Sequence, residues 1–224
     1  MSAAEDYRKQ ASALAYRNQA FINGRFVDAA SGETFDCISP IDGQTLTKVA
    51  SCGVEDVDRA VTAARNIFEK GTWSEMAPRE RKERMLKFAA ALADHADELA
   101  LLETLDMGKP ITFSRQGDME GVIRTVQWYA EAIDKVYDEL APMGTGAVGM
   151  ITREPLGVVS AVVPWNFPLL MAAWKFGPAL AAGNSVIMKP AEQSPLSCLR
   201  VAEIAAEAGI PDGVFQVLPG FGET

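Results

Sequence analysis

A single amide side chain stands in an unusually stiff turn. Asn166 lies between Pro164 and Pro168, directly after the apolar run VVSAVV. Each proline disfavours helical geometry in the residue before it, so Val163 and Phe167 are expected to be extended and Pro168 to begin a helix. The amide then stands at the carboxyl end of a strand, where open α/β sheets bind their ligands. The competing interpretation is an Asn that hydrogen-bonds to its own backbone in the turn.

A Lys and a Glu follow the next predicted strand. In the segment MKPAEQSP, Lys189 ends a strand at 185–189 and Glu192 lies in the loop after it. A carboxylate at that place can accept hydrogen bonds from both hydroxyls of an adenosine ribose, and it repels a 2′-phosphate, so it favours NAD. No G-x-G-x-x-G follows the first strand, so the usual dinucleotide fingerprint is absent. Two solvated charges on a surface loop are the competing interpretation.

Alternating strands and helices in the last third of the sequence position these side chains. The predicted strands are 157–163, 185–189 and 214–218, and the predicted helices between them are 168–182 and 196–208. This order is half of a doubly wound, Rossmann-type parallel sheet, so the fold class is α/β. The first strand has the pattern of burial on both faces, which requires helices on both sides. Three parallel strands are few, so we expect further strands beyond Thr224.

The residues before this unit are expected to be mostly helical after an initial hairpin. Asn23-Gly24 stands between alternating apolar residues and predicts a two-stranded antiparallel hairpin. Apolar residues at intervals of three and four predict the helices, which we expect at 4–17, at 54–70, at 78–107 as two helices in series, and at 117–140. In the last helix, one face carries Val122, Val126, Tyr129, Ile133 and Val136.

The composition changes after residue 140. The segment APMGTGAVGMITREPLG is rich in Gly and contains two prolines, so it is expected to leave the helical layer as a loop and a strand. We therefore divide the chain into residues 1–140, 141–156 and 157–224.

Composition and charge exclude several classes of protein. The 224 residues are 48% hydrophobic and 23% charged, which is typical of a globular chain. A net charge of −9 without a Lys/Arg cluster argues against a nucleic-acid or anionic-membrane partner. The sequence shows neither a membrane-spanning segment nor a secretory signal, so the expected location is the cytoplasm. Three cysteines without C-x-x-C spacing and one histidine, His95, make disulfides and zinc sites unexpected.

Several segments together resemble the aldehyde dehydrogenase superfamily. VVPWNFPLLMAAWKFGPALAAGNSVIMKPAEQSPLS resembles the core of its cofactor domain, and the family's earlier landmarks are matched in order by FINGRFVDA, ISPIDGQTL, LETLDMGKP and ITREPLGVV. WYAEAIDKVYDEL and GPALAAGNSVIMKPAEQSPLS are most similar to the γ-glutamyl-γ-aminobutyraldehyde dehydrogenases of polyamine catabolism. The resemblance covers nearly the whole chain.

The resemblance implies a role for each polar site residue. The side-chain NH2 of Asn166 would donate to the oxygen that becomes negative when a cysteine thiolate attacks an aldehyde. The thiohemiacetal would transfer hydride to NAD, and water activated by a glutamate would hydrolyse the thioester. Lys189 and Glu192 would hold the adenosine ribose, and the turn of Val163, Pro164, Trp165 and Asn166 would line the cofactor cleft.

The resemblance also assigns apolar residues and a weaker cation site. Phe167, Met171 and Trp174 would line the aldehyde channel, although an apolar helix stripe is more often part of a core. Asp106, with the carbonyl of Ile38, resembles a monovalent-cation site in some relatives. No other metal is expected.

The family's nucleophile and base have no match in this sequence. In aldehyde dehydrogenases the nucleophilic cysteine, the general-base glutamate and a glycine-rich pyrophosphate loop follow the PGFGET landmark, where this sequence ends. Cys37, Cys52 and Cys198 match none of them. We therefore expect the amino-terminal part of an NAD-dependent aldehyde dehydrogenase, inactive alone, with residues 141–156 as the arm of a homodimer or homotetramer. The alternatives are a truncated nucleotide-binding fragment and an interaction module.

Overall fold

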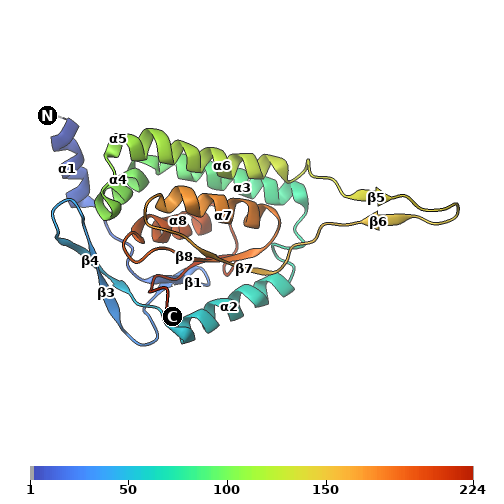
Figure 1. Cartoon of the computed structure of the whole chain (residues 1–224), viewed down its shortest axis with the longest axis horizontal. Coiled ribbons are helices and arrows are strands. Elements are labelled where there is room, and N and C mark those ends of the chain that lie inside the picture. Colours follow the sequence, from blue (N-terminus) through green and yellow to red (C-terminus); the bar gives the residue numbers. More distant parts are fainter. Residues whose placement is uncertain (1–2, 224) are drawn as a thin grey trace.

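The central element of the computed structural model, which describes residues 3–223, is a five-stranded mixed sheet (Figure 1). Its strand order is β2-β1-β9-β8-β7. Three strands are parallel, namely β7 (Val158–Val162), β8 (Ser185–Lys189) and β9 (Phe215–Val217), and two are antiparallel to them or to each other, namely β1 (Ala20–Ile22) and β2 (Arg25–Val27). The predicted α/β class with a parallel sheet is confirmed.

Helices cover the two faces of the sheet (Figure 1). The two crossover helices, α7 (Pro168–Ala181) and α8 (Leu196–Glu207), pack on one face, and α2 (Val54–Glu69) packs on the other. Over α7 lies an outer layer, formed by α3 (Pro78–Asp94) and α6 (Met119–Ala132), and beside α8 lies α4 (Ala96–Met107). Within residues 3–223 no helix is both long and apolar enough to cross a membrane.

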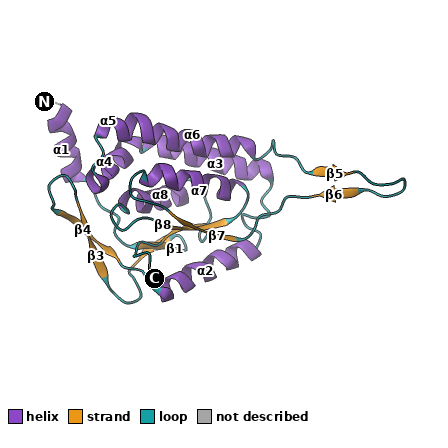
Figure 2. Cartoon of the chain, viewed as in Figure 1, coloured by secondary structure: helices purple, strands orange, loops and turns teal. Residues whose placement is uncertain are grey.

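The remaining elements lie at the margins of this core (Figure 2). They are α1 (Ala3–Ala13), a hairpin of β3 (Thr34–Ile38) and β4 (Thr45–Ala50), the short α5 (Ile111–Phe113), a π-helical turn η1 (Ser114–Asp118), and a hairpin of β5 (Glu139–Ala141) and β6 (Gly149–Ile151). The β5–β6 hairpin extends far from the rest of the chain (Figure 2).

The predicted amino-terminal hairpin forms, but it belongs to the main sheet. Asn23 and Gly24 both have positive φ, 51° and 78°, as a tight hairpin turn requires. A Cβ at Gly24 would displace the Asp212 carboxylate, which is the end of a flexible side chain, so the positive φ is the main reason for glycine there. Phe21 of β1 pairs with Val217 of β9, so β1, and not a strand from beyond Thr224, lies next to β9 in the sheet. Pairing between the two ends of a sequence leaves no local pattern, so the sequence did not predict it.

The prediction that 158–163 is buried on both faces is wrong. Ser160 and Val162 of β7 are exposed, and Val162 retains 65% of its accessible surface. The full burial occurs in β8, where residues 185–188 are all buried. β7 is an edge strand, and α2 packs mainly against β8, so one face of β7 has little cover.

The helices predicted at 117–140 and 4–17 are both shorter in the structure. α6 ends at Ala132, and Val136, which we expected on the buried face, is 62% exposed. Contacts with α3 continue past the end of the helix, since the Lys82 Nζ donates to Asp134 Oδ2 at 3.0 Å and Ile133 packs against the core, but Val136 no longer lies on a buried face. α1 likewise ends at Ala13. The single strand expected in 141–157 is instead a strand pair.

Candidate functional site

The turn that carries Asn166 leaves β7 at its carboxyl end. The Val163 N–H donates to the Lys189 carbonyl at 3.1 Å, so the pairing of β7 with β8 continues one residue beyond the strand. Phe167 is not helical, as the following proline requires, but with φ −144° and ψ 67° it is not fully extended as we expected; Pro168 is the first residue of α7, as predicted. Pro164, Trp165, Asn166 and Phe167 are exposed.

The amide of Asn166 is available to a ligand. Within residues 3–223 the structure gives this side chain no hydrogen bond. The competing interpretation, in which Asn166 bonds its own backbone, therefore has no contact in its support. An exposed donor pair at the carboxyl edge of a parallel sheet is suited to a carbonyl or oxyanion oxygen.

Lys189 and Glu192 lie at the same edge of the sheet. Val162 and Lys189 are register partners, so the ends of β7 and β8 are side by side. The Lys189 Nζ donates to the Pro190 carbonyl at 3.0 Å and lies 3.5 Å from Glu192 Oε2. The pKa of Glu192 lies below its ordinary value because its own backbone N–H bonds to the carboxylate and Lys189 is near. A charged, partly exposed carboxylate can accept hydrogen bonds from sugar hydroxyls.

A groove runs along the α2 side of these strand ends. Its volume is about 530 Å³, and its lining includes Val162, Lys189, the segment 218–222 after β9, and Val61 and Arg65 of α2. Most of the lining of the groove is apolar, and it contains two cationic side chains, Lys189 of β8 and Arg65 of α2. A mostly apolar lining with a few polar groups is typical of small-molecule sites.

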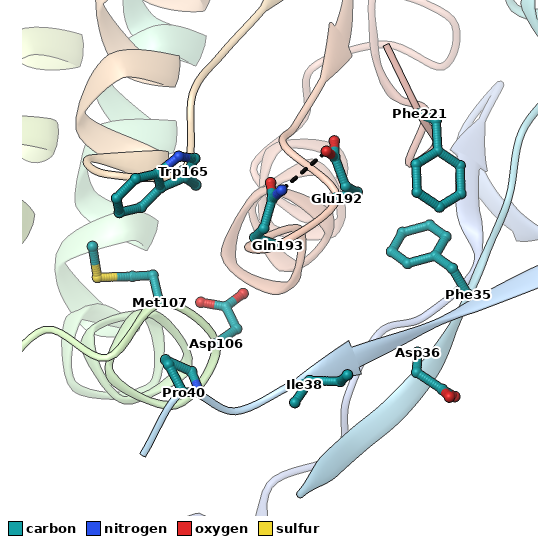
Figure 3. Close-up of a pocket in the computed structure, with 10 residues that line it drawn as sticks. All are labelled: Phe35, Asp36, Ile38, Pro40, Asp106, Met107, Trp165, Glu192, Gln193 and Phe221. Carbon is teal, nitrogen blue, oxygen red and sulfur yellow. Dashed lines mark hydrogen bonds between the residues drawn. The ribbon is translucent and has the colours of Figure 1, made fainter. Parts of the chain in front are cut away.

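A second cavity lies between the loop after β8 and the end of β3 (Figure 3). Its volume is about 370 Å³. Trp165, Glu192 and Gln193 face Ile38 and Asp106 across it, and Gln193 Nε2 donates to Glu192 Oε1 at 3.0 Å (Figure 3). Glu192 therefore lies between this cavity and the strand ends that carry Lys189.

The two weak cation candidates both line this second cavity. Asp106 Oδ2 accepts the Leu196 N–H at 3.0 Å, whereas Oδ1 has no partner within the described residues. Burial raises the pKa of Asp106 well above its ordinary value. Ile38 is 53% exposed at the end of β3. Within residues 3–223 no three His, Cys, Asp or Glu side chains form a metal-binding group.

The three predicted channel residues lie on or beside one face of α7. Phe167 and Trp174 are exposed, at 41% and 51%, and Met171 is partly buried against the core. The opposite face of α7 carries the buried residues, among them Leu169 and Phe176. The interpretation that these residues belong to the hydrophobic core therefore does not fit Phe167 or Trp174, and it fits Met171 only in part.

None of the three cysteines is placed or poised to act as a nucleophile. Cys37, Cys52 and Cys198 are all buried. Burial raises the pKa of Cys37 and of Cys52 to about 12, and it raises the pKa of Cys198 as well.

We predict that these thiols react slowly in the native chain. A pKa that is about three units higher lowers the thiolate fraction at about pH 8 by roughly a thousandfold, and burial also blocks access. A disulfide reagent such as Ellman's reagent should therefore modify the native chain far more slowly than the denatured chain, in which all three thiols react. A cysteine that reacts as fast in the native chain as in the denatured chain would contradict the conclusion that all three thiols are buried and unreactive.

Sequence reasoning missed two residues that support the Asn166 turn. Glu103, at the buried face of α4, accepts the Leu169 N–H at 2.7 Å. Lys109, just after α4, places its Nζ 3.9 Å from the centroid of the Phe167 ring. One signal was present: Glu103 and Asp106 are spaced three residues apart on an otherwise apolar helix, so their carboxylates share one face.

The buried Glu103 makes stability depend on pH. Burial raises the pKa of Glu103 to about 7, above 4.5 for an exposed Glu, so between these values only the folded state holds the proton. The stabilisation is complete below about pH 4.5 and is lost as pH rises through about 7, by about 3 kcal/mol for this group. Urea unfolding at about pH 5 and about pH 8 should show wild type losing more stability than Glu103→Gln. The buried Asp106 is present in both proteins, so its own pH dependence should be common to them. If wild type and Glu103→Gln lost equal stability between the two pH values, the prediction would be refuted.

Comparison with known proteins gives the family of the chain. The sequence model of the aldehyde dehydrogenase family matches residues 26–224. The NADP/NAD-dependent aldehyde dehydrogenase PuuC of Escherichia coli (strain K12) is 53% identical over 216 residues, which are 96% of this chain and 44% of that protein.

Two solved structures superpose on the chain with a TM-score of 0.97. One is the gamma-glutamyl-gamma-aminobutyraldehyde dehydrogenase of Burkholderia cenocepacia J2315, at 58% identity, and the other is the P. syringae indole-3-acetaldehyde dehydrogenase AldA with NAD+ and IAA, at 56% identity. Each match covers 98% of this chain and 44% of the solved one, so the chain spans less than half the length of these relatives. With the family match extending over almost the whole sequence, the chain belongs to the aldehyde dehydrogenase family.

Proposed function

We propose that this chain carries the cofactor-binding and oxyanion-binding part of an NAD-dependent aldehyde dehydrogenase. The observation that carries the proposal is the placement of Asn166, Lys189 and Glu192 at one carboxyl edge of the parallel sheet, all with side chains that a ligand can reach. The reaction is the oxidation of an aldehyde to a carboxylate.

The chain's own residues fit an adenosine ribose and an aldehyde oxygen. The charged Glu192 accepts from the ribose hydroxyls, and Lys189, at the end of β8 and 3.5 Å from Glu192 Oε2, donates to them. Asn166 donates its NH2 to the aldehyde oxygen as negative charge develops there, in a turn that two prolines keep in place. Exposed Phe167 and Trp174, with Met171, give the aldehyde an apolar wall. NAD, when bound, supplies the hydride acceptor.

The chain alone is proposed to be inactive. The described residues bring no thiol to Asn166, and the three cysteines are buried with raised pKa values. The nucleophile and the base therefore have to come from sequence outside these residues, in a protein closer in length to the relatives. The alternative is a fragment that only binds nucleotide weakly. It also predicts no turnover by this chain alone, but it does not predict aldehyde oxidation by a longer protein that contains the chain.

The proposed substrate is an amino-aldehyde such as γ-glutamyl-γ-aminobutyraldehyde, in the cytoplasm. The activity in the name of the Burkholderia cenocepacia relative supports this class. The name of the E. coli relative includes both NADP and NAD, so Glu192 biases the cofactor choice toward NAD without making it absolute.

The cofactor part of the proposal is tested by calorimetry with NAD. Glu192→Ala removes a charged acceptor of two hydroxyl hydrogen bonds and should weaken NAD binding by about 10- to 100-fold. Glu120→Ala, which removes an exposed carboxylate of α6, is the matched control and should bind like wild type. Equal affinity of wild type and Glu192→Ala would remove Glu192 from the cofactor site.

The projecting β5–β6 hairpin is proposed as the arm of a homodimer or homotetramer. Leu140 and Met150 are cross-strand partners, and each is 73% exposed. Further apolar side chains of the same segment are exposed, namely Met143, Val148, Ile151 and Leu156. An apolar patch of this kind on a free hairpin is typical of an interaction surface.

Light scattering tests the arm. Met150→Asp should shift an oligomer toward monomers, whereas Thr145→Asp, at the exposed loop between β5 and β6, should leave the mass unchanged. A wild-type chain that is strictly monomeric at high concentration would remove both the arm and the interaction-module hypothesis.

A further inference from the structure

The first turn of α7 is held by an acid from a different helix. The N-cap residue Phe167 has no polar side chain, and Pro168 has no N–H. Leu169 therefore offers the first free N–H of the helix, which no nearby side chain of its own segment satisfies. Glu103 of α4, fully buried, accepts this N–H at 2.7 Å.

The same carboxylate also contacts the next helix. The Ser197 hydroxyl, in the first turn of α8, donates to Glu103 Oε1 at 3.3 Å. α7 begins directly after the Asn166 turn, and α8 begins directly after the loop of Glu192. One oxygen of Glu103 thus ties together the starts of the two helices that follow the two site loops.

A second contact from the same region supports the turn. Lys109 lies just after the left-handed Gly108 that ends α4, and its Nζ stands over the Phe167 ring at 3.9 Å. The cation also pairs with the buried carboxylate of Asp118 in η1. Phe167 and Leu169, on either side of Pro168, are therefore both held from α4 and its immediate continuation.

Asn166 depends on this backbone support. Its exposed side chain has no hydrogen bond within the described residues, so the place from which the amide can reach a ligand is set by the backbone of the turn. A turn that shifts by about 1 Å misplaces a donor that must meet a developing charge.

We propose that Glu103 is a positioning residue, which holds the Asn166 amide in place by accepting the Leu169 N–H at the start of α7. Its importance for catalysis rests on the function proposed above, but the positioning itself is a property of this chain.

Two neutral variants separate the acceptor from charge and volume. Glu103→Gln keeps an oxygen that can accept the Leu169 N–H, and Glu103→Met fills a similar space without an acceptor. The readout is the fluorine NMR spectrum of the chain labelled with 5-fluorotryptophan. Its four tryptophans are Trp73, Trp128, Trp165 and Trp174, and Trp165 is adjacent to Asn166.

The expected result is specific to one signal. Glu103→Met should shift or broaden the Trp165 resonance while Trp73 and Trp128 stay at their wild-type positions, and Glu103→Gln should leave Trp165 close to wild type. An unchanged Trp165 in Glu103→Met would overturn the proposal, as would an equal change in Glu103→Gln, since charge and not the acceptor would then be responsible.

Two further measurements keep the test decisive. If Glu103→Met does not fold, hydrogen exchange of the Leu169 amide in wild type and Glu103→Gln decides: slow exchange supports the contact, and exchange at the rate of an unfolded peptide overturns it. In an active full-length protein, Glu103→Met should lower kcat by about 10- to 100-fold, a larger effect than on the KM for NAD, because the contact to Leu169 is shorter than the contact to Ser197 in α8. An unchanged kcat would overturn the proposal, whereas absence of aldehyde oxidation in wild type would refute the proposed function and leave the fluorine result standing.

Discussion

Replacing Asn166 by alanine in an aldehyde-oxidising protein that contains this chain is expected to lower kcat by about 100- to 1,000-fold. The amide is the exposed donor at the carboxyl end of β7, and a donor that is aimed in advance at a developing negative charge contributes more in the transition state than in the ground state. Steady-state kinetics with NAD and an amino-aldehyde measure the effect.

The fold should not change in this variant. Asn166 is exposed and makes no hydrogen bond within the described residues, so Asn166→Ala should unfold within about 0.5 kcal/mol of wild type. The affinity for NAD should also be retained. A kcat within about threefold of wild type would exclude Asn166 from the oxyanion site, because the loss of such a donor has a far larger effect.

Replacing Phe176 by alanine is expected to destabilise the chain by about 3–5 kcal/mol. The Phe176 side chain is fully buried in α7 and joins the helical layer to the sheet, since its ring lies 5.8 Å from that of Phe88 and 5.1 Å from that of Phe215. Removing it loses these contacts and leaves a cavity that the surrounding elements fill only in part. Urea unfolding measures the change in the free energy of unfolding.

Trp174→Ala is the matched control for this substitution. It removes a larger aromatic side chain from the same helix, but from the half-exposed face. Alanine has the highest helix propensity, so neither variant loses stability through the helix itself. The control should lose much less stability than Phe176→Ala. If the two variants lost a similar free energy of unfolding, Phe176 would not be a main contributor to the packing of the core.

Local patterns predicted the elements that position the site. The runs that form β8, α7 and α8 carry their own signals in apolar periodicity, prolines and glycines, and these elements occur within one or two residues of the expected bounds. The prediction that Asn166 and Lys189 follow neighbouring strands needed only the rule that parallel strands end at the same edge.

Contacts between distant segments could not be predicted in this way. The pairing of Phe21 with Val217 and the exposure of Val162 depend on which strands are neighbours in the folded chain. The role of Glu103 was missed for the same reason. Its carboxylate accepts the N–H of Leu169, which is 66 residues later in the sequence, and no local pattern connects the two residues.

NADH formation tests the proposed function most directly, when γ-glutamyl-γ-aminobutyraldehyde is added to the full-length protein with NAD after the intact mass of that protein has been determined. We expect NADH to form in step with the carboxylate product, and this 224-residue chain alone to form none. No NADH from the full-length protein with any of a panel of aldehydes would contradict the proposed function, and turnover by this chain alone would contradict the proposal that the nucleophile lies outside it.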